Sequence, residues 1–119
     1  MSPQLYKVAV TEYIATGLDF NHWKSKPFLA LMTYVQLERA YGWTAFKQVF
    51  AKYRALPAEQ RPQNDQQKID MWMTMFSKTV GEDLSSFFLS WGHPVTDEAR
   101  NSISDLPGSG LSMSDLLND

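Results

Sequence analysis

The side chains that could do chemistry in this sequence are few and widely separated. The sequence contains two histidines, His22 and His93, and no cysteine. The commonest catalytic zinc site uses two histidines four residues apart on one helix, with a glutamate beside them. Neither histidine has a second histidine at that spacing. We therefore expect no metal ligand here, and we interpret His22 as packing with Phe20 and Trp23 and His93 as part of a Gly-Pro turn.

The hydroxyl and carboxylate side chains offer no catalytic arrangement either. There is no cysteine nucleophile and no G-x-S-x-G motif. The segment Gly108-Ser109-Gly110 lacks the preceding strand and the lysine that a phosphate-binding loop needs. The acidic pairs Glu82-Asp83 and Asp97-Glu98 fall where we expect the first turns of helices, and the helix dipole accounts for acidic residues there. We expect this chain, taken alone, to be inactive as an enzyme.

The amino-acid composition limits the classes of protein to which this sequence can belong. A chain of 119 residues that is 44% apolar suits one domain with a substantial core. The net charge of −2 gives no electrostatic reason to expect nucleic acid or an anionic membrane as a partner. No apolar run is long enough to span a bilayer. The first ten residues, MSPQLYKVAV, lack the basic region and apolar core of a signal peptide.

Apolar residues recur at helical spacing along most of the chain, and no segment alternates with the period of a strand. We expect helices over residues 4–16, 64–80 and 82–91, and a short helix capped by Thr96. Residues 18–23 are expected to form a loop, after which Ser25 caps the next helix with Pro27 in its first turn. The clearest amphipathic helix begins at Asn64, which with Gln67 resembles a capping box.

The most detailed local pattern lies in residues 29–57, LALMTYVQLERAYGWTAFKQVFAKYRALP. It predicts two helices that meet at one corner, because glycine enters a left-handed conformation without a Cβ penalty. The corner is Gly42-Trp43, and we expect an αα-hairpin there with the Trp43 indole filling the junction. Trp72 and Trp91 are likewise expected in the core. The whole chain is predicted to be all-α.

The predicted architecture is a compact bundle of five to six helices over residues 1–107, followed by a flexible tail at 108–119. Glycine, serine and small acidic residues dominate that tail, which has the sequence GSGLSMSDLLND. Residues after Ser112 are expected to add at most one turn of helix.

Several spaced motifs between Phe28 and Pro107 resemble one family. They are Y-x-x-L-x-x-x-x-G-W, F-F-x-x-W-G-x-P and S-I-x-x-L-P, and they are met here by Tyr34, Leu37, Gly42, Trp43, Phe87, Phe88, Trp91, Gly92, Pro94, Ser102, Ile103, Leu106 and Pro107. In their order they resemble the C-terminal helical part of the M60-like, or enhancin-like, zinc metallopeptidase domain. That family includes secreted mucin-degrading bacterial proteases, viral enhancins and animal channel-associated factors.

The resemblance implies a parent domain in which two histidines of H-E-x-x-H and a later glutamate hold zinc. This sequence has no H-E-x-x-H, so no catalytic residue and no metal ligand carries over to it. The implied function is a non-catalytic C-terminal subdomain that buttresses the zinc lobe of a peptidase acting on mucin-type glycoproteins. The implied partners are the rest of that domain and, through it, a glycoprotein, and the implied location is extracellular or at the cell surface.

The loops at 21–26 and 92–96 are the segments expected to contribute one edge of a substrate cleft. Trp23 and His93 are the residues singled out there, because no periodic apolar face includes Trp23 and aromatic rings can stack on sugars. The alternative interpretation is a helical protein-interaction module from a family member without peptidase activity. Either way, we expect an exposed apolar patch near the N-terminal helix, or self-association of the isolated chain.

Overall fold

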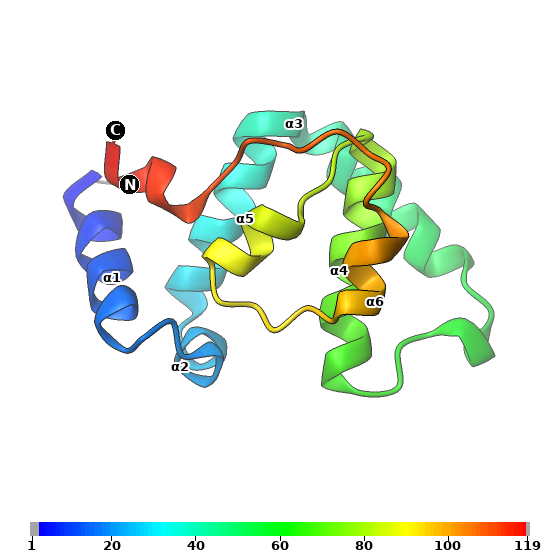
Figure 1. Ribbon diagram of the computed structural model, residues 1–119, viewed down its shortest axis with the longest axis horizontal. Coiled ribbons are helices and arrows are strands. Elements are labelled where there is room, and N and C mark those ends of the chain that lie inside the picture. Colours follow the sequence, from blue (N-terminus) through cyan, green and yellow to red (C-terminus); the bar gives the residue numbers. More distant parts are fainter. Residues whose placement is uncertain (1–2, 119) are drawn as a thin grey trace.

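The computed structural model describes residues 3–118, and their backbone forms six α-helices and two short 3-10 helices. Their bounds are α1 Pro3–Ala15, α2 Phe20–Ser25, α3 Pro27–Ala55, η1 Ala58–Gln60, α4 Asp65–Val80, α5 Ser85–Ser90, α6 Asp97–Ser102 and η2 Met113–Asn118. Within that range there is no β-strand, and only an isolated bridge joins Asp83 to Gly108. The prediction of an all-α bundle is confirmed. The molecule measures 41 × 26 × 25 Å, with α1 at one end of the long axis (Figure 1).

The segment between the first two long helices differs from the prediction. Residues 18–23 were expected to be a loop, but α2 begins at Phe20 because the Asp19 carboxylate accepts a hydrogen bond from the Asn21 backbone N–H at 3.0 Å. Ser25 is the last residue of α2 rather than the cap of α3. Lys26 takes the N-cap position of α3 without a side-chain hydrogen bond, and Pro27 follows in the first turn as expected.

The corner predicted at Gly42 is a bend within α3. Gly42 has φ 80° and ψ 169°, a conformation that only glycine adopts without strain but that is not the left-handed helical one. Figure 1 shows the first half of α3 rising from α2 and the second half running away from it toward the other end of the molecule. The interpretation of Trp43 as a buried plug is wrong, because this side chain is 64% exposed.

The second half of the chain follows the predicted pattern closely. Asn64 caps α4 by accepting from the Gln67 backbone N–H at 2.9 Å, and Gly81 ends it in the left-handed conformation. Gln67 completes the start of the helix by accepting from the backbone N–H of Gln63, one residue earlier than in a standard capping box. Thr96 caps α6 through the Ala99 N–H. The acidic pair Glu82-Asp83 lies before α5 rather than inside it, and Asp83 accepts from the Ser85 N–H.

The core contains buried residues from α1, α3, α4, α5 and η2, and the most extensive contact is between α3 and α4. The largest fully buried side chains are Trp91, Tyr13, Phe76, Phe87, Phe88, Leu29, Met32, Leu37, Met73, Leu84, Ile103 and Leu116. Each predicted inward residue of α5 is among them, as is Ile103 after α6. Trp91 is fully buried as expected, whereas Trp72 lies half-buried at the edge of the core.

The C-terminal segment packs against the bundle instead of extending from it. Met113 and Leu116 are buried, and η2 lies against both α1 and α5. Hydrogen bonds along the segment hold it in place: the Ser109 N–H donates to the Asp83 carbonyl at 3.1 Å, Gln36 Nε2 donates to the Ser112 carbonyl at 2.9 Å, and the Met113 N–H donates to Ser90 Oγ at 2.8 Å. The apolar residues spaced through this serine-rich stretch give it a face to bury, which its composition did not suggest. At most one turn of helix was expected after Ser112, whereas η2 is a 3-10 helix of six residues.

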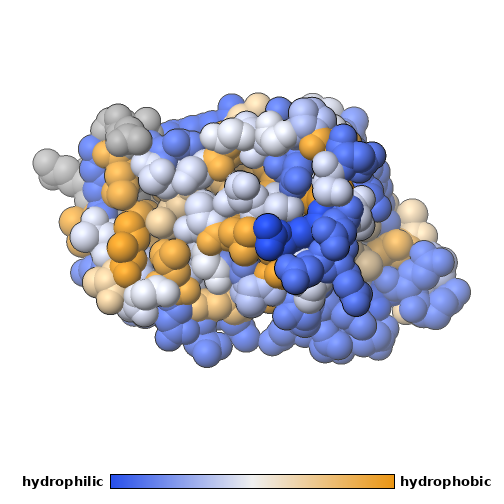
Figure 2. Space-filling model, in the orientation of Figure 1, coloured by the Kyte–Doolittle hydropathy of each residue, from blue (hydrophilic) through white to orange (hydrophobic). Residues whose placement is uncertain are grey.

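No helix in the described part of the chain is both long enough and apolar enough to cross a membrane. The surface still carries large apolar side chains. Figure 2 shows apolar residues gathered over α1, where Val8 is 56% exposed and Ile14 is 42% exposed. Two large apolar side chains of the N-terminal helix are therefore exposed, in the region where an apolar patch was expected.

Candidate functional site

Trp23, the first of the two residues singled out from the sequence, is held on the short helix α2. Its indole Nε1 donates to Thr33 Oγ1 at 3.2 Å, and Thr33 is fully buried in the first half of α3. The ring stacks on Phe20, with ring centroids 5.5 Å apart. Trp23 is therefore half-buried and oriented by α3, with part of its surface open to solvent.

His93, the second residue, lies in the turn between α5 and α6 and is only 6% exposed. Its ring meets Trp23 at 4.4 Å, Phe20 at 5.1 Å and Phe88 at 5.4 Å between centroids. Burial among these rings disfavours the charged imidazolium and lowers the pKa of His93 to about 4. Its Nε2 atom is buried without a hydrogen-bond partner in the described structure.

The structure therefore brings Trp23 and His93 together, although they are far apart in the sequence. The contact joins α2 to the turn after α5, so the two loops predicted as a cleft edge form one surface region. His93 supports the Trp23 ring from behind, because it has almost no surface of its own. Any direct contact with a ligand at this edge must be made by Trp23 or by its exposed neighbours.

The backbone beside His93 is fixed by close packing at Gly92. Gly92 has φ 78°, and a Cβ at this position would lie 2.6 Å from the Leu18 carbonyl oxygen. The Tyr13 hydroxyl donates a hydrogen bond to the Trp91 carbonyl next to it. Burial, and then the charge of Asp19, raises the pKa of Tyr13 to about 12, so this hydroxyl stays a donor.

His22 does not belong to this cluster. Its ring stacks on Tyr13, with centroids 6.1 Å apart and planes inclined at 15°. His22 was expected to pack with Phe20 and Trp23, and this expectation is wrong because its ring packs on Tyr13 instead. Because α2 is a helix, Phe20 and Trp23 are three residues apart on one face while His22 points toward α1.

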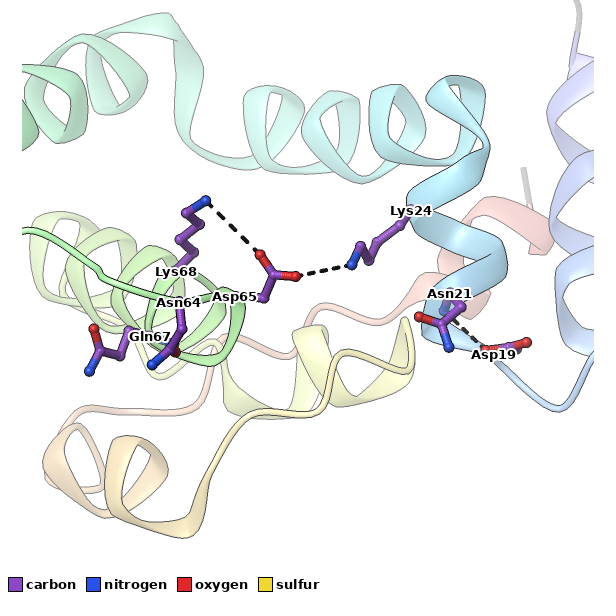
Figure 3. A network of polar contacts seen from close by, with 7 residues as sticks. All are labelled: Asp19, Asn21, Lys24, Asn64, Asp65, Gln67 and Lys68. Atoms are coloured by element: carbon purple, nitrogen blue, oxygen red, sulfur yellow. Dashed lines mark hydrogen bonds and ion pairs between the residues drawn. The ribbon is translucent and has the colours of Figure 1, made fainter.

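A polar network links α2 to the start of α4 beside the aromatic cluster (Figure 3). Asp65 accepts from Lys24 Nζ at 3.1 Å and lies 4.0 Å from Lys68 Nζ. These side chains are 46% to 69% exposed, so the pairs contribute little to stability. Asp70, one turn further along α4, accepts from both the backbone N–H and the hydroxyl of Thr96, at 2.9 and 2.8 Å. Asp70 thereby fixes the start of α6.

A surface groove beside the 59–63 loop was not predicted. It has a volume of about 480 Å³ and lies between this loop, α4 and α6, and its lining includes the charged residues Glu59, Arg61, Asp70 and Glu98. The sequence showed this loop only as a proline-containing polar stretch. Asp70, one of its acidic residues, already accepts two hydrogen bonds from Thr96.

The described residues do not fit a zinc site. No group of three histidine, cysteine or acidic side chains lies close enough to hold a metal ion within that part of the chain. The two histidines are committed to different aromatic contacts, His22 on Tyr13 and His93 inside the Trp23 cluster. No metal-dependent step can be assigned to these residues.

The described residues thus form a helical bundle in which α2 and the turn after α5 bring an aromatic cluster to the surface. Comparison with known proteins gives the family. The family described as peptidase M60, enhancin and enhancin-like matches residues 1–92. The chain belongs to this family.

Several vertebrate proteins are similar to this chain. "TRPM8 channel-associated factor 3" of Rattus norvegicus is 35% identical over 107 residues, which is 90% of this chain and 11% of that protein. "TRPM8 channel-associated factor 2" of Homo sapiens is 37% identical over 107 residues, with the same coverage. A homologue in Danio rerio is 37% identical over 95 residues. The chain thus spans about a tenth of the length of these relatives, and no solved structure matches it.

Proposed function

We propose that this chain is a non-catalytic helical subdomain of an M60 protein, and that it supports the zinc-bearing lobe of a secreted peptidase acting on mucin-type glycoproteins. The observation that carries the proposal is the apolar surface over α1 in a chain that the M60 family covers from residue 1 to 92. Exposed apolar surface of this kind is typical of a face that packs against another part of a protein.

The position of α1 fits this role. The described part of the chain begins with α1, and η2 near its other end packs against α1 (Figure 1). Val8 and Ile14 of this helix remain exposed. In the proposal, α1 packs on the zinc-bearing lobe, which supplies the H-E-x-x-H that this sequence lacks.

The aromatic edge formed by Trp23 is the part of this subdomain proposed to face the substrate. Trp23 is held rigidly by Thr33 and His93 and keeps part of its ring exposed, and a rigid ring of this kind can stack on a sugar face. The parent enzyme is proposed to act outside the cell or at its surface, where mucin-type glycoproteins occur.

The alternative function is a helical protein-interaction module. The names of the relatives favour it, because they describe proteins associated with a channel rather than peptidases. In that case α1 would still pack on the rest of the protein, but no zinc chemistry would follow. The sequence of the longer gene product distinguishes the two, since only a peptidase requires an intact H-E-x-x-H and a later glutamate.

The test is the double substitution V8D/I14D in the longer gene product and in the 119-residue chain. Because both side chains are exposed here, the isolated chain should keep its thermal midpoint. The longer protein should lose thermal stability and glycoprotein cleavage, since two charges would be buried in the proposed interface. The matched control, L31D/L89D, changes two exposed apolar residues outside α1 and should leave both properties unchanged. A longer V8D/I14D protein with normal stability and cleavage would overturn the proposal.

A further inference from the structure

The second half of α3, residues 43–55, carries a stripe in which aromatic and basic side chains alternate. The stripe consists of Trp43, Lys47, Phe50 and Arg54, which follow one another at steps of four, three and four residues. This spacing places them on one face of the helix. All four are exposed, Trp43 to 64% and Phe50 to 46%. The stripe is therefore a surface of mixed apolar and cationic character.

The aromatic members of the stripe are held in place by a larger aromatic cluster. Phe46 lies 5.4 Å from Trp43 and 6.3 Å from Phe50 between ring centroids, and Phe50 lies 5.9 Å from Trp72 of α4. Tyr34, on the first half of α3, is 42% exposed and packs on Trp72 at 5.9 Å. The exposed rings are thus fixed on a buried support, and ordering them for binding costs little conformational entropy.

The charge around the stripe differs from that of the whole chain. Residues 39–58 contain Arg39, Lys47, Lys52 and Arg54 and no acidic residue, although the chain as a whole carries a net charge of −2. Lys52 donates to Thr79 Oγ1 at 2.7 Å. Lys47 and Arg54 make no ion pair within the described residues. The two cations of the stripe are therefore available to an external anion.

We propose that this stripe binds an acidic amphipathic segment of a partner protein. Carboxylates of the partner meet Lys47 and Arg54, and its apolar side chains pack on Trp43 and Phe50. The distance from Trp43 to Arg54 along the helix axis is about 16 Å, which corresponds to three turns of a docked helix. Complementary charge fixes the orientation of the segment, and the aromatic contacts supply the buried apolar area.

The arrangement of the stripe favours a protein segment over a membrane or a nucleic acid. A membrane-surface helix keeps its apolar face continuous and its cations on the opposite side, whereas Lys47 here lies between Trp43 and Phe50. A nucleic acid requires a broad positive field, which a chain with net charge −2 does not supply. An acidic segment needs only the local charge that the stripe carries.

The size of the exposed surface favours a short segment over a second folded copy. From the exposed fractions of Tyr34, Trp43 and Phe50, the three rings offer roughly 350 Å². A stable interface between folded proteins needs roughly 800 Å² on each side. The stripe also lies at the opposite end of the molecule from α1 (Figure 1), so the proposal does not depend on the function proposed for α1.

The test uses the uniformly ¹⁵N-labelled 119-residue chain, whose four tryptophans give four indole N–H signals. The probe is a synthetic peptide of about fourteen residues with leucines on one helical face and glutamates flanking them, and its control carries lysine in place of each glutamate. The glutamate peptide should shift the indole signals of Trp43 and Trp72 and leave those of Trp23 and Trp91 in place. Its affinity should fall as salt is raised, and the lysine peptide should bind at least tenfold more weakly.

Variants locate the interaction on the stripe. K47E/R54E should weaken binding of the glutamate peptide by about tenfold or more, and W43A should weaken it while leaving the fold intact. The charge-matched control K26E/K78E should bind as the unchanged chain does. The proposal is overturned by equal binding of the two peptides, by equal losses in K47E/R54E and its control, or by no binding. It is also overturned if phosphatidylserine vesicles or a thymidine oligonucleotide bind more tightly, or if K47E/R54E abolishes self-association of the chain.

Discussion

Gly92 is the residue whose replacement the packing tolerates least. A Cβ there would lie 2.6 Å from the Leu18 carbonyl and 2.8 Å from the Tyr13 hydroxyl, at a positive φ. We expect Gly92→Ala to lower the free energy of unfolding by about 3 kcal/mol, measured by urea denaturation. Gly110→Ala is the matched control, because Gly110 also has positive φ but no atom within 4 Å of the added Cβ. Gly110→Ala should lower the free energy of unfolding by about 1 kcal/mol. Equal losses in the two variants would show that packing at Gly92 is unimportant.

His93 makes stability depend on pH. Its folded pKa, about 4, lies below the ordinary 6.5, so the unfolded chain binds the proton first as pH falls. The neutral, buried His93 therefore contributes roughly 3 kcal/mol to the free energy of unfolding above pH 6.5. This contribution is lost as pH falls toward 4. His93→Phe, which keeps an aromatic ring in an aromatic cluster, should remove this part of the pH dependence in urea titrations between pH 4 and 7.5. His22→Gln, outside the cluster, should retain it, and an unchanged slope in His93→Phe would refute the assignment.

At the scale of elements, α4 shows how an N-cap residue and the helical spacing of apolar residues together specify a helix. Asn64 supplies the acceptor for the Gln67 N–H, and the inward positions Met73 and Phe76 follow at helical spacing. Replacing Asn64 with alanine should cost about 1 kcal/mol of unfolding free energy, measured by chemical denaturation. Asn64→Asp is the control, because its carboxylate can accept the same hydrogen bond and interacts favourably with the helix dipole. Similar losses in both variants would contradict a capping role.

The same reasoning explains which elements the sequence could predict. In α4 and α5 one apolar face is covered by the core, so the period identifies the buried residues, Met73, Phe76 and Phe87 among them. The second half of α3 has apolar residues on more than one face. Periodicity alone does not show which face is covered by the core. Trp43 was therefore predicted to be buried, although it is exposed. Only the packing of α4 against Phe46 and Val49 decides it.

The sequence singled out Trp23 and His93 but did not show that the two residues lie beside each other. Trp23 and His93 come from distant segments, and no local pattern brings them together. The helix α2, which orients Trp23, has six residues and is too short to show a period. One signal was available: Asp19 stands directly before it as an N-cap residue. The burial of His93 depends on rings from Phe20, Trp23 and Phe88, which lie on two separate helices.

At the scale of the whole molecule, the Trp23 edge can be tested in a protein that joins this chain to the zinc-bearing lobe of an M60 peptidase and hydrolyses glycoprotein. Trp23→Ala removes the exposed ring and should raise KM several-fold while leaving kcat and zinc content unchanged, because the ring is proposed to bind substrate and not to react. Trp23→Phe keeps an aromatic face and should restore most of the affinity. Unchanged KM in the alanine variant would remove the proposed substrate edge.

The apolar surface of α1 also determines how the 119-residue chain behaves alone. Val8 and Ile14 are 56% and 42% exposed, and no other part of the described structure covers them. Bringing two such surfaces together removes apolar area from water, at roughly 25 cal/mol for each Å² buried. We expect the apparent mass in analytical ultracentrifugation to rise with concentration, and V8D/I14D to keep the chain monomeric. K47E/R54E should associate as the unchanged chain does, because its substitutions lie at the other end of the molecule (Figure 1). A chain that stays monomeric at millimolar concentration would show that α1 has too little exposed apolar area to drive association.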